Sequence, residues 1–264
     1  METRLLSPGS GLAFASATLR AGGLVSFPTE TVYGLGADAR NGEAVARIFE
    51  AKGRPRFNPL IVHVDNFDEA QALAEFSGPA LDFASAFWPG AMTLVVPKSE
   101  KAGLSDLVTA GLPNVAIRIP ENPVAVGLLQ EFGGPIAAPS ANRSGHISPT
   151  EAAHVLDGLD GRIDAVIDGG RCAVGLESTI IGFEAGNPVL LRPGGVPLEA
   201  LQQASATTVV TRTESAGITA PGQLSSHYAP ASPVRLNVLR PEKDEVWLGF
   251  GPECLDADLS LSAT

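Results

Sequence analysis

The sequence predicts an α/β fold built on a mixed sheet, and two observations carry this prediction. Short apolar runs bounded by Gly and Pro recur along the first two hundred residues and are typical of strands. Segments with helical periodicity lie between several of these runs. Strands and helices alternate without strict βαβ regularity, which favours a mixed sheet.

The expected strands share a short apolar core and a Gly or Pro near one end. They cover residues 23–28, 60–64, 92–97, 115–120, 136–141, 164–170, 178–183 and 189–194.

Four helices are expected between these strands, and an amphipathic helix is expected within the first twenty residues. Asn41 is expected to cap a helix over 42–52, because an Asn side chain can accept hydrogen bonds from the first helical amides. The other three are 66–76 with Asp65 as its cap, 123–132 with Pro123 in its first turn, and 149–156 beginning at Pro149.

The amino-acid composition changes near residue 203 and the helical periodicity is lost, which predicts that the chain has three parts. Residues 1–203 are expected to form the main domain, and 204–231, rich in Ser, Thr, Ala and Gly, a linker. Residues 232–264 are expected to form a short tail with two strand-like runs, 233–239 and 245–251, and the tail is too short for an independent core.

Composition limits the classes of function. The chain has 264 residues and a formal net charge of −11, so it has no global basic field for a nucleic-acid duplex. The two cysteines form neither a disulfide framework nor a metal-ligand spacing, and no metal site in the protein is expected. No apolar run approaches the length of a membrane span, so we expect a cytoplasmic protein without a membrane partner.

The segment 26–38, SFPTETVYGLGAD, places Thr29 and Thr31 just after a strand and before two glycines. Loops at strand ends bind ligands in α/β sheets, and hydroxyls with glycine amides suit carboxylate or phosphate oxygens. From this stretch alone, a turn with locally bonded threonines is the favoured interpretation.

The segment 51–64, AKGRPRFNPLIVHV, gathers cations against an acidic background. Lys52 and Arg54 point the same way if the segment is extended, and Asn58 adds an amide at the strand entrance. Strand alternation places Ile61 and His63 on one face of the sheet. A lone histidine there is usually structural, and only converging cations favour a ligand.

Two later segments are weaker signals when taken singly. PIAAPSANRSGHISPT runs from an apolar strand into Ser140 and Asn142, which can present polar groups to a nucleotide. In GLESTIIGF and VLLRPGGV, Ser178 opens a strand and Arg192 ends another, where an arginine can contact phosphate. The Walker loop, the GxGxxG fingerprint and the HExxH motif do not occur.

Together the motifs resemble the threonylcarbamoyl-AMP synthase family, which has the YrdC-type domain. PTETVYGLGADA, KGRPRFNPLIVHV, WPGAMTLVV, VAIRIP, APSANRSG, ESTIIGF and LLRPGG follow in this order over residues 22–196. APGQLSSHYAP resembles the linker of two-domain members, but it lacks their basic and aromatic residues, and the tail is shorter than their carboxy-terminal domain.

The resemblance implies an L-threonylcarbamoyladenylate synthase on a YrdC-like, twisted and largely parallel sheet with a concave, locally positive face. Such an enzyme condenses L-threonine, bicarbonate and ATP, with magnesium, to threonylcarbamoyl-AMP and pyrophosphate. The adenylate passes to tRNA-modification proteins that make threonylcarbamoyladenosine.

The resemblance also implies residue roles. Lys52 and Arg54 would be catalytic. Threonine would be bound by Thr29, Thr31, Arg54, His63 and Ser178, and the nucleotide by Lys52, Asn58, Arg118, Ser140, Asn142, Arg192 and the linker residue Tyr228.

Two other functions stay open at this point. A concave basic face can hold double-stranded RNA by its phosphates, although the net charge argues against more than a weak RNA contact. A carbamoyl-transfer domain of the hydrogenase-maturation type uses a related fold, but such proteins carry zinc-finger cysteine pairs that this chain lacks.

Overall fold

A computed structural model describes residues 2–55, 57–211, 232–238, 240–250, 254 and 257–260. The chain divides into two compact units, Met1–Ala229 and Pro230–Thr264. The first unit contains the motifs identified above between residues 22 and 196, and the linker motif APGQLSSHYAP lies outside the described residues.

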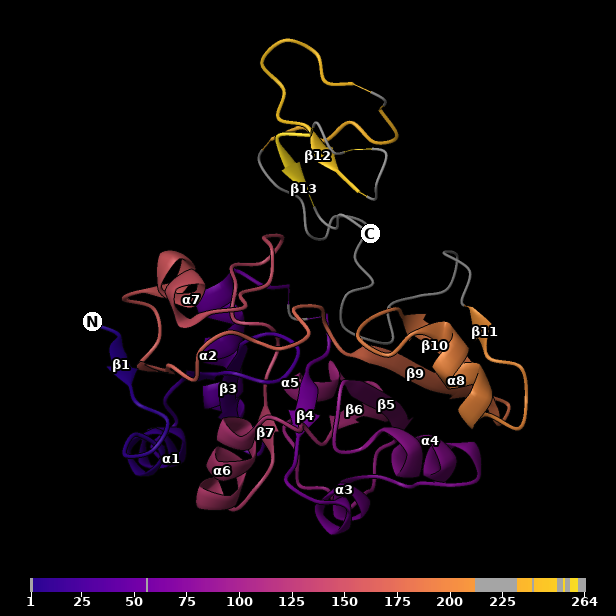
Figure 1. The fold of residues 1–264 in the computed structure, drawn as a ribbon. Helices are drawn as coiled ribbons and strands as arrows, with labels where there is room; N and C mark the ends of the chain where they lie inside the picture. The colour runs from indigo at the N-terminus through magenta and orange to yellow at the C-terminus, as the bar shows by residue number, and fades with distance from the viewer. Residues whose placement is uncertain are drawn as a thin grey trace. The chain divides into compact units, whose positions relative to one another are not determined.

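An eleven-stranded sheet organises the described part of the first unit (Figure 1). Its strand order is β1-β8-β2-β3-β7-β4-β6-β5-β9-β10-β11. The strands are β1 (Arg4–Leu6), β2 (Val25–Phe27), β3 (Gly34–Asp38), β4 (Ile61–His63), β5 (Met92–Pro97), β6 (Asn114–Arg118), β7 (Ile136–Ala137), β8 (Ala165–Ile167), β9 (Thr179–Glu184), β10 (Asn187–Arg192) and β11 (Val210–Thr211).

The sheet is mixed along its whole width. Parallel pairs are β1–β8, β2–β8, β4–β6, β5–β9 and β10–β11. Antiparallel pairs are β2–β3, β3–β7, β4–β7, β5–β6 and β9–β10. The prediction of a mixed open sheet with flanking helices is therefore confirmed.

Helices pack on both faces of the sheet and build two hydrophobic cores. The larger core lies under α2, α3, α4, α5, α7 and α8, and the smaller core lies under α1 and α6. The helices are α1 (Leu12–Arg20), α2 (Gly42–Lys52), α3 (Phe67–Leu73), α4 (Pro79–Phe87), α5 (Asp106–Thr109), α6 (Pro123–Phe132), α7 (Ala152–Leu159) and α8 (Leu198–Ala204).

The face covered by α1 and α6 is open over the middle of the sheet. There a small cluster of Ile61, Val95, Ala116 and Ile180 lies apart from both helical cores. Strand alternation accounts for this split, because Val62 faces the larger core while Ile61 and His63 turn to the open face. The predicted faces of β4 are confirmed, and the open face is where a ligand can reach the sheet.

Helix capping agrees with the sequence at two predicted positions and differs at a third. The Asn41 side chain accepts hydrogen bonds from the amides of Glu43 and Ala44 at the start of α2. Pro123 is the first residue of α6, as predicted. Asp65 was the wrong cap for α3, because the neighbouring Asn66 accepts from the Glu69 amide at 2.9 Å.

The second unit contains a two-stranded parallel sheet of β12 (Leu248–Gly249) and β13 (Leu259–Ser260). The prediction of a strand over 233–239 is wrong for the described residues 233–238, which form no strand. The predicted strand over 245–251 is present only as the short β12. In the part of the chain that the structure describes, no helix is long and apolar enough to cross a membrane.

Candidate active site

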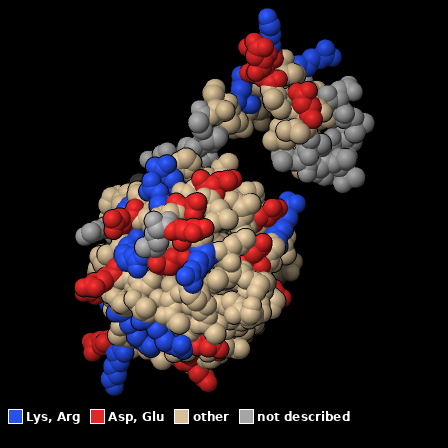
Figure 2. Space-filling model, turned by 90° about the vertical axis from the view of Figure 1, so that its left-hand side faces the viewer, with Lys and Arg blue, Asp and Glu red and all other residues tan. Residues whose placement is uncertain are grey.

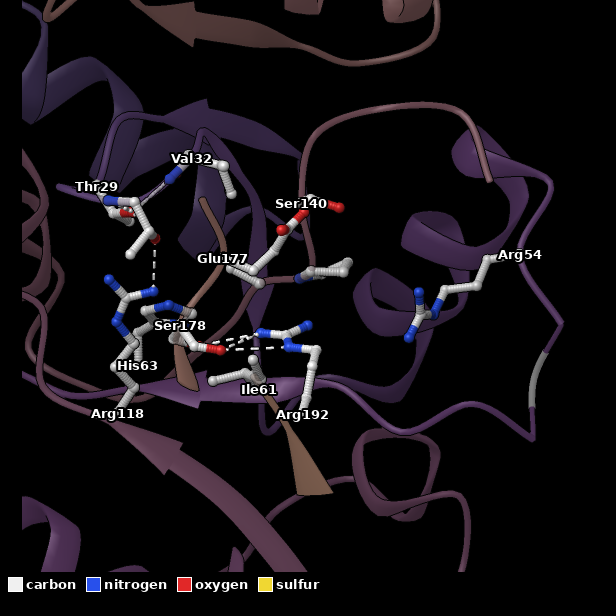
Figure 3. A pocket seen from close by; sticks show the side chains of 14 residues that line it. Thr29, Val32, Arg54, Ile61, His63, Arg118, Ser140, Glu177, Ser178 and Arg192 are labelled. Carbon is white, nitrogen blue, oxygen red and sulfur yellow. Dashed lines mark hydrogen bonds between the residues drawn. The ribbon is translucent and has the colours of Figure 1, made fainter. Parts of the chain in front are cut away.

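A cleft of about 510 Å³, part of it open to solvent, lies on the open face, over β4 and β6 (Figure 3). It brings together residues from all four segments in which the sequence analysis placed candidate ligand-binding side chains. The described residues that line it are Thr29, Thr31, Val32, Gly34, Arg54, Ile61, His63, Arg118, Ala138, Pro139, Ser140, Glu177, Ser178 and Arg192.

One wall of the cleft is a buried polar network built on the two threonines. The hydroxyls of Thr29 and Thr31 lie 2.8 Å apart, and Arg118 donates from Nη1 to the Thr31 hydroxyl at 2.8 Å. The other terminal nitrogen of Arg118 forms a 2.5 Å ion pair with Oε1 of Glu30. The second Glu30 oxygen accepts from backbone amides at the start of α6. The network fixes both hydroxyls and holds the guanidinium at the cleft wall.

His63 lies on the cleft floor and is only 3% exposed. Burial, and then the charge of Arg118, lowers its pKa to about 3, so the imidazole is neutral at neutral pH. The ring of Phe27 packs edge-on against it with centroids 6.1 Å apart. Its Nδ1 atom is buried and has no hydrogen-bond partner in the described structure. His63 can therefore offer a neutral polar group, but not a positive charge, to a ligand.

Arg54 lines the opposite side of the cleft, on the loop between α2 and β4 (Figure 3). It donates from Nη2 to the Pro59 carbonyl at 3.0 Å, which holds the side chain along its own loop. Burial, and then the charge of Arg192, lowers the pKa of Arg54 to about 10, so it is a cation at neutral pH. Two mutually repelling guanidiniums near one cleft favour an anion there.

Lys52 does not line the cleft but supports the loop that does. It is the last residue of α2, and Gly53 ends the helix in the left-handed conformation, with φ at 60°. Its ammonium donates to the Ser140 carbonyl at 2.5 Å and also to the Asn142 carbonyl. Burial, and then the charge of Arg54, lowers the pKa of Lys52. The prediction that Lys52 and Arg54 project together from an extended segment is therefore wrong, because the helix end at Gly53 directs them to different partners.

The loop after β7 is shaped by Ser140 and Asn142. The Ser140 hydroxyl lines the cleft and donates to Oδ1 of Asn142 at 2.6 Å. The Asn142 amide group donates to the carbonyls of Arg143 and His146, so this side chain closes the loop on itself. Ser140 is placed for a ligand, and Asn142 lies behind it.

Ser178 and Arg192 form the third side of the cleft. The Ser178 hydroxyl bonds to Thr93 at 2.7 Å, and Arg192 donates to the Ser178 carbonyl at 2.8 Å (Figure 3). Gly194 makes this approach feasible, because an added Cβ would lie 2.3 Å from the Glu177 carbonyl oxygen. The small residue therefore lets the β10 end pack directly on the start of β9.

Of the described residues expected at the nucleotide, Lys52, Asn58 and Asn142 are not part of the cleft lining. Asn58 is fully buried beside Arg54, and neither polar atom of its side chain has a hydrogen-bond partner in the described structure. Tyr228 lies outside the described residues.

Two acidic residues with clear places in the site were not singled out from the sequence. Glu30 neutralises the buried Arg118, and Glu177 lines the cleft. Both lie inside the motifs PTETVYGLGADA and ESTIIGF. The position of each carboxylate inside a motif, next to apolar and small residues, could have indicated that it belongs to the site.

The fold and the cleft define an α/β protein with a cleft, lined by arginines and hydroxyl groups, on the open part of its sheet. The family model Sua5/YciO/YrdC, described as "Telomere recombination", matches residues 17–194. The chain belongs to this family, which confirms the resemblance seen in its motifs.

Curated relatives from two organisms extend the match beyond the catalytic motifs. A threonylcarbamoyl-AMP synthase of Bacillus subtilis is 47% identical over 88% of this chain and 68% of its own length. A protein of the same name from Pyrococcus abyssi is 46% identical over 84% of this chain and 66% of its own length. The chain thus spans about two thirds of the length of these relatives.

A solved structure agrees with the fold. The crystal structure of P. abyssi Sua5 complexed with L-threonine matches with a TM-score of 0.88 and 39% identity, covering 100% of this chain and 84% of that chain.

Proposed function

We propose that this protein is an L-threonylcarbamoyladenylate synthase. It condenses L-threonine, bicarbonate and ATP to threonylcarbamoyl-AMP and pyrophosphate, and the adenylate is used to make threonylcarbamoyladenosine in tRNA. The names of the curated relatives and the threonine complex of the P. abyssi protein support this activity.

The observation that carries the proposal is the convergence of Arg54, Arg118 and Arg192 with hydroxyl groups in one cleft. Bicarbonate, the threonine carboxylate and the ATP phosphates are all anionic and repel one another. A partly buried group of guanidiniums and hydroxyls offsets that repulsion before any bond forms. Because the chain has a formal net charge of −11, attraction of anions depends on such a local group of cations.

The reaction needs positioning more than it needs a protein nucleophile. The threonine amine attacks the carbon of bicarbonate, a C–O bond breaks and water leaves, which gives the carbamate. A carbamate oxygen then attacks the α-phosphorus of ATP and expels pyrophosphate. Lys52 acts by holding the carbonyls of Ser140 and Asn142, which keeps the Ser140 hydroxyl at the cleft. Catalysis then comes from proximity and charge stabilisation, without a covalent enzyme intermediate.

Magnesium would enter with ATP. Among the described residues there is no group of three or more His, Cys, Asp or Glu that could hold a metal ion. An ion that enters with ATP can be held by phosphates and water, which is how Mg²⁺ commonly binds at nucleotide sites. The ion would offset charge on the departing pyrophosphate.

Selection of threonine requires a partner for its hydroxyl group. Thr29, Thr31 and the neutral His63 line the cleft and can exchange hydrogen bonds with a hydroxyl. A site with such partners rejects an analogue that lacks the hydroxyl, because its own buried polar groups would be left unpaired. We expect valine to be a much poorer substrate than threonine.

The alternative function, binding of double-stranded RNA, has less support. On the face shown in Figure 2, basic and acidic side chains are interspersed among the described residues, with no continuous basic surface. A weak RNA contact remains compatible with this surface.

The test is pyrophosphate release with ATP, magnesium, bicarbonate and each amino acid in turn. We expect release with threonine and a loss of about a hundredfold or more in Arg54→Gln, because a charge-assisted contact to an anion is removed. Equal release with every amino acid would contradict the proposal. RNA titrated at low and moderate salt is the second arm, and tight binding with a steep salt slope would favour the alternative.

A further inference from the structure

Glu177 is a carboxylate among cations. Of the described residues that line the cleft, it alone carries an acidic side chain, whereas Arg54, Arg118 and Arg192 are basic. It lies directly before β9 and next to Ser178, and its side chain projects among the lining residues (Figure 3).

The Glu177 side chain is held in place from one side only. The Ser148 hydroxyl donates to Oε1, and within the described structure Oε2 accepts no hydrogen bond. The Glu177 carbonyl also accepts from the Gly195 amide at 2.8 Å, which fixes the backbone. One carboxylate oxygen is therefore oriented and the other is left for a ligand.

The other candidate groups at the cleft are already committed. Both oxygens of Glu30 are taken up by Arg118 and by backbone amides. His63 is neutral and deeply buried. A positively charged part of a ligand would therefore find its complementary charge at Glu177.

An α-amino acid is a zwitterion at neutral pH, so its site needs charges of both signs. The arginines can receive its carboxylate, but they repel its ammonium group. We propose that Glu177 binds the α-ammonium group of the amino-acid substrate and thereby selects an amino acid over the hydroxy acid of the same shape. This inference rests on the proposed function, whose substrate site it completes.

The experiment compares binding of L-threonine with binding of 2,3-dihydroxybutyrate of matching stereochemistry, in which a hydroxyl replaces the amine. Calorimetric titrations are done with the wild-type protein, with Glu177→Gln and with Glu184→Gln. The glutamine keeps an oxygen that can accept from Ser148, and Glu184 is an exposed carboxylate at the other end of β9. The same proteins are assayed for the KM of ATP and of magnesium.

We expect the wild-type protein and Glu184→Gln to prefer threonine by about tenfold or more, as a charge-assisted hydrogen bond implies. In Glu177→Gln the preference should fall to about threefold or less, with the KM of ATP within about twofold of wild type. An unchanged preference in Glu177→Gln overturns the inference alone. A changed KM for magnesium in Glu177→Gln, with an unchanged preference for threonine over the hydroxy acid, also overturns the inference alone. Failure of the wild-type protein to bind threonine overturns both the inference and the proposed function.

Discussion

Arg118 and Glu30 form an ion pair of 2.5 Å that joins β6 to the loop after β2, and their side chains are only 4% and 9% exposed. The pair also orients the Thr31 hydroxyl through the second terminal nitrogen of Arg118. A single buried interaction thus links the stability of the sheet to the geometry of the cleft.

Glu30→Ala should destabilise the protein strongly, because it leaves the Arg118 charge buried without a counter-charge. Removing one partner of a buried ion pair typically costs about 3–5 kcal/mol. Urea unfolding at neutral pH measures the change, with the exposed Glu184→Ala as the matched control. A loss no larger than in that control would show that the pair contributes little.

His63 should make the stability depend on pH. Its folded-state pKa of about 3 lies below the unfolded value of about 6.5, so only the unfolded chain gains a proton as the pH falls through 6. This contribution is fully present above pH 6.5 and is lost as the pH falls toward 3. Between pH 7 and pH 5 the loss should be about 2 kcal/mol.

Urea unfolding at the two pH values checks this, since His63→Gln should lack that part of the loss. The exposed His146→Gln should keep it. NMR provides an independent reading, because the ring protons of His63 should not shift between pH 8 and pH 5. A titration of this ring with a midpoint near 6.5 would contradict the account.

Gly194→Ala should disrupt the cleft through the backbone. The added Cβ would lie 2.3 Å from the Glu177 oxygen and 2.6 Å from the Ser178 carbonyl carbon, so β9 and β10 would have to separate. Overpacking of this kind typically costs about 1–3 kcal/mol. We expect a lower melting temperature and weaker threonine binding than in Gly9→Ala, where an added Cβ meets nothing within 4 Å. Identical threonine affinity in both variants would refute this.

Lys52→Met should loosen the loop that carries Ser140 without unfolding α2. Methionine fills a similar volume but cannot donate to the Ser140 and Asn142 carbonyls. Hydrogen exchange should increase over residues 138–146, and pyrophosphate release should fall about tenfold or more. The exposed Lys101→Met serves as the control. Unchanged exchange in this loop would show that Lys52 does not hold it.

Local sequence patterns predicted the helices and strands better than they predicted the contacts between them. Alternation along β4 was enough to place His63 with Ile61, and the side chain of Asn41 was enough to place the start of α2. Asp65 and Asn66 are both good caps, so the sequence could not decide between them.

The site depended on contacts between distant residues, which local patterns do not encode. Nothing in PTETV indicates that Glu30 pairs with Arg118, 88 positions away. Lys52 and Arg54 were expected together on an extended segment, but the helix end at Gly53 separates their directions. The order of the motifs was enough to indicate the family. The different roles of the two cations, Lys52 holding a loop and Arg54 lining the cleft, could be seen only in the folded structure.

The central claim is that one cleft gathers the amino acid and the nucleotide between Arg54, Arg118 and Arg192. A crystal structure with L-threonine and a non-hydrolysable ATP analogue tests it most directly. We expect the threonine carboxylate and the phosphates to lie within hydrogen-bonding distance of these guanidiniums, with the threonine amine facing the α-phosphate. Density for both ligands away from this cleft would contradict the account.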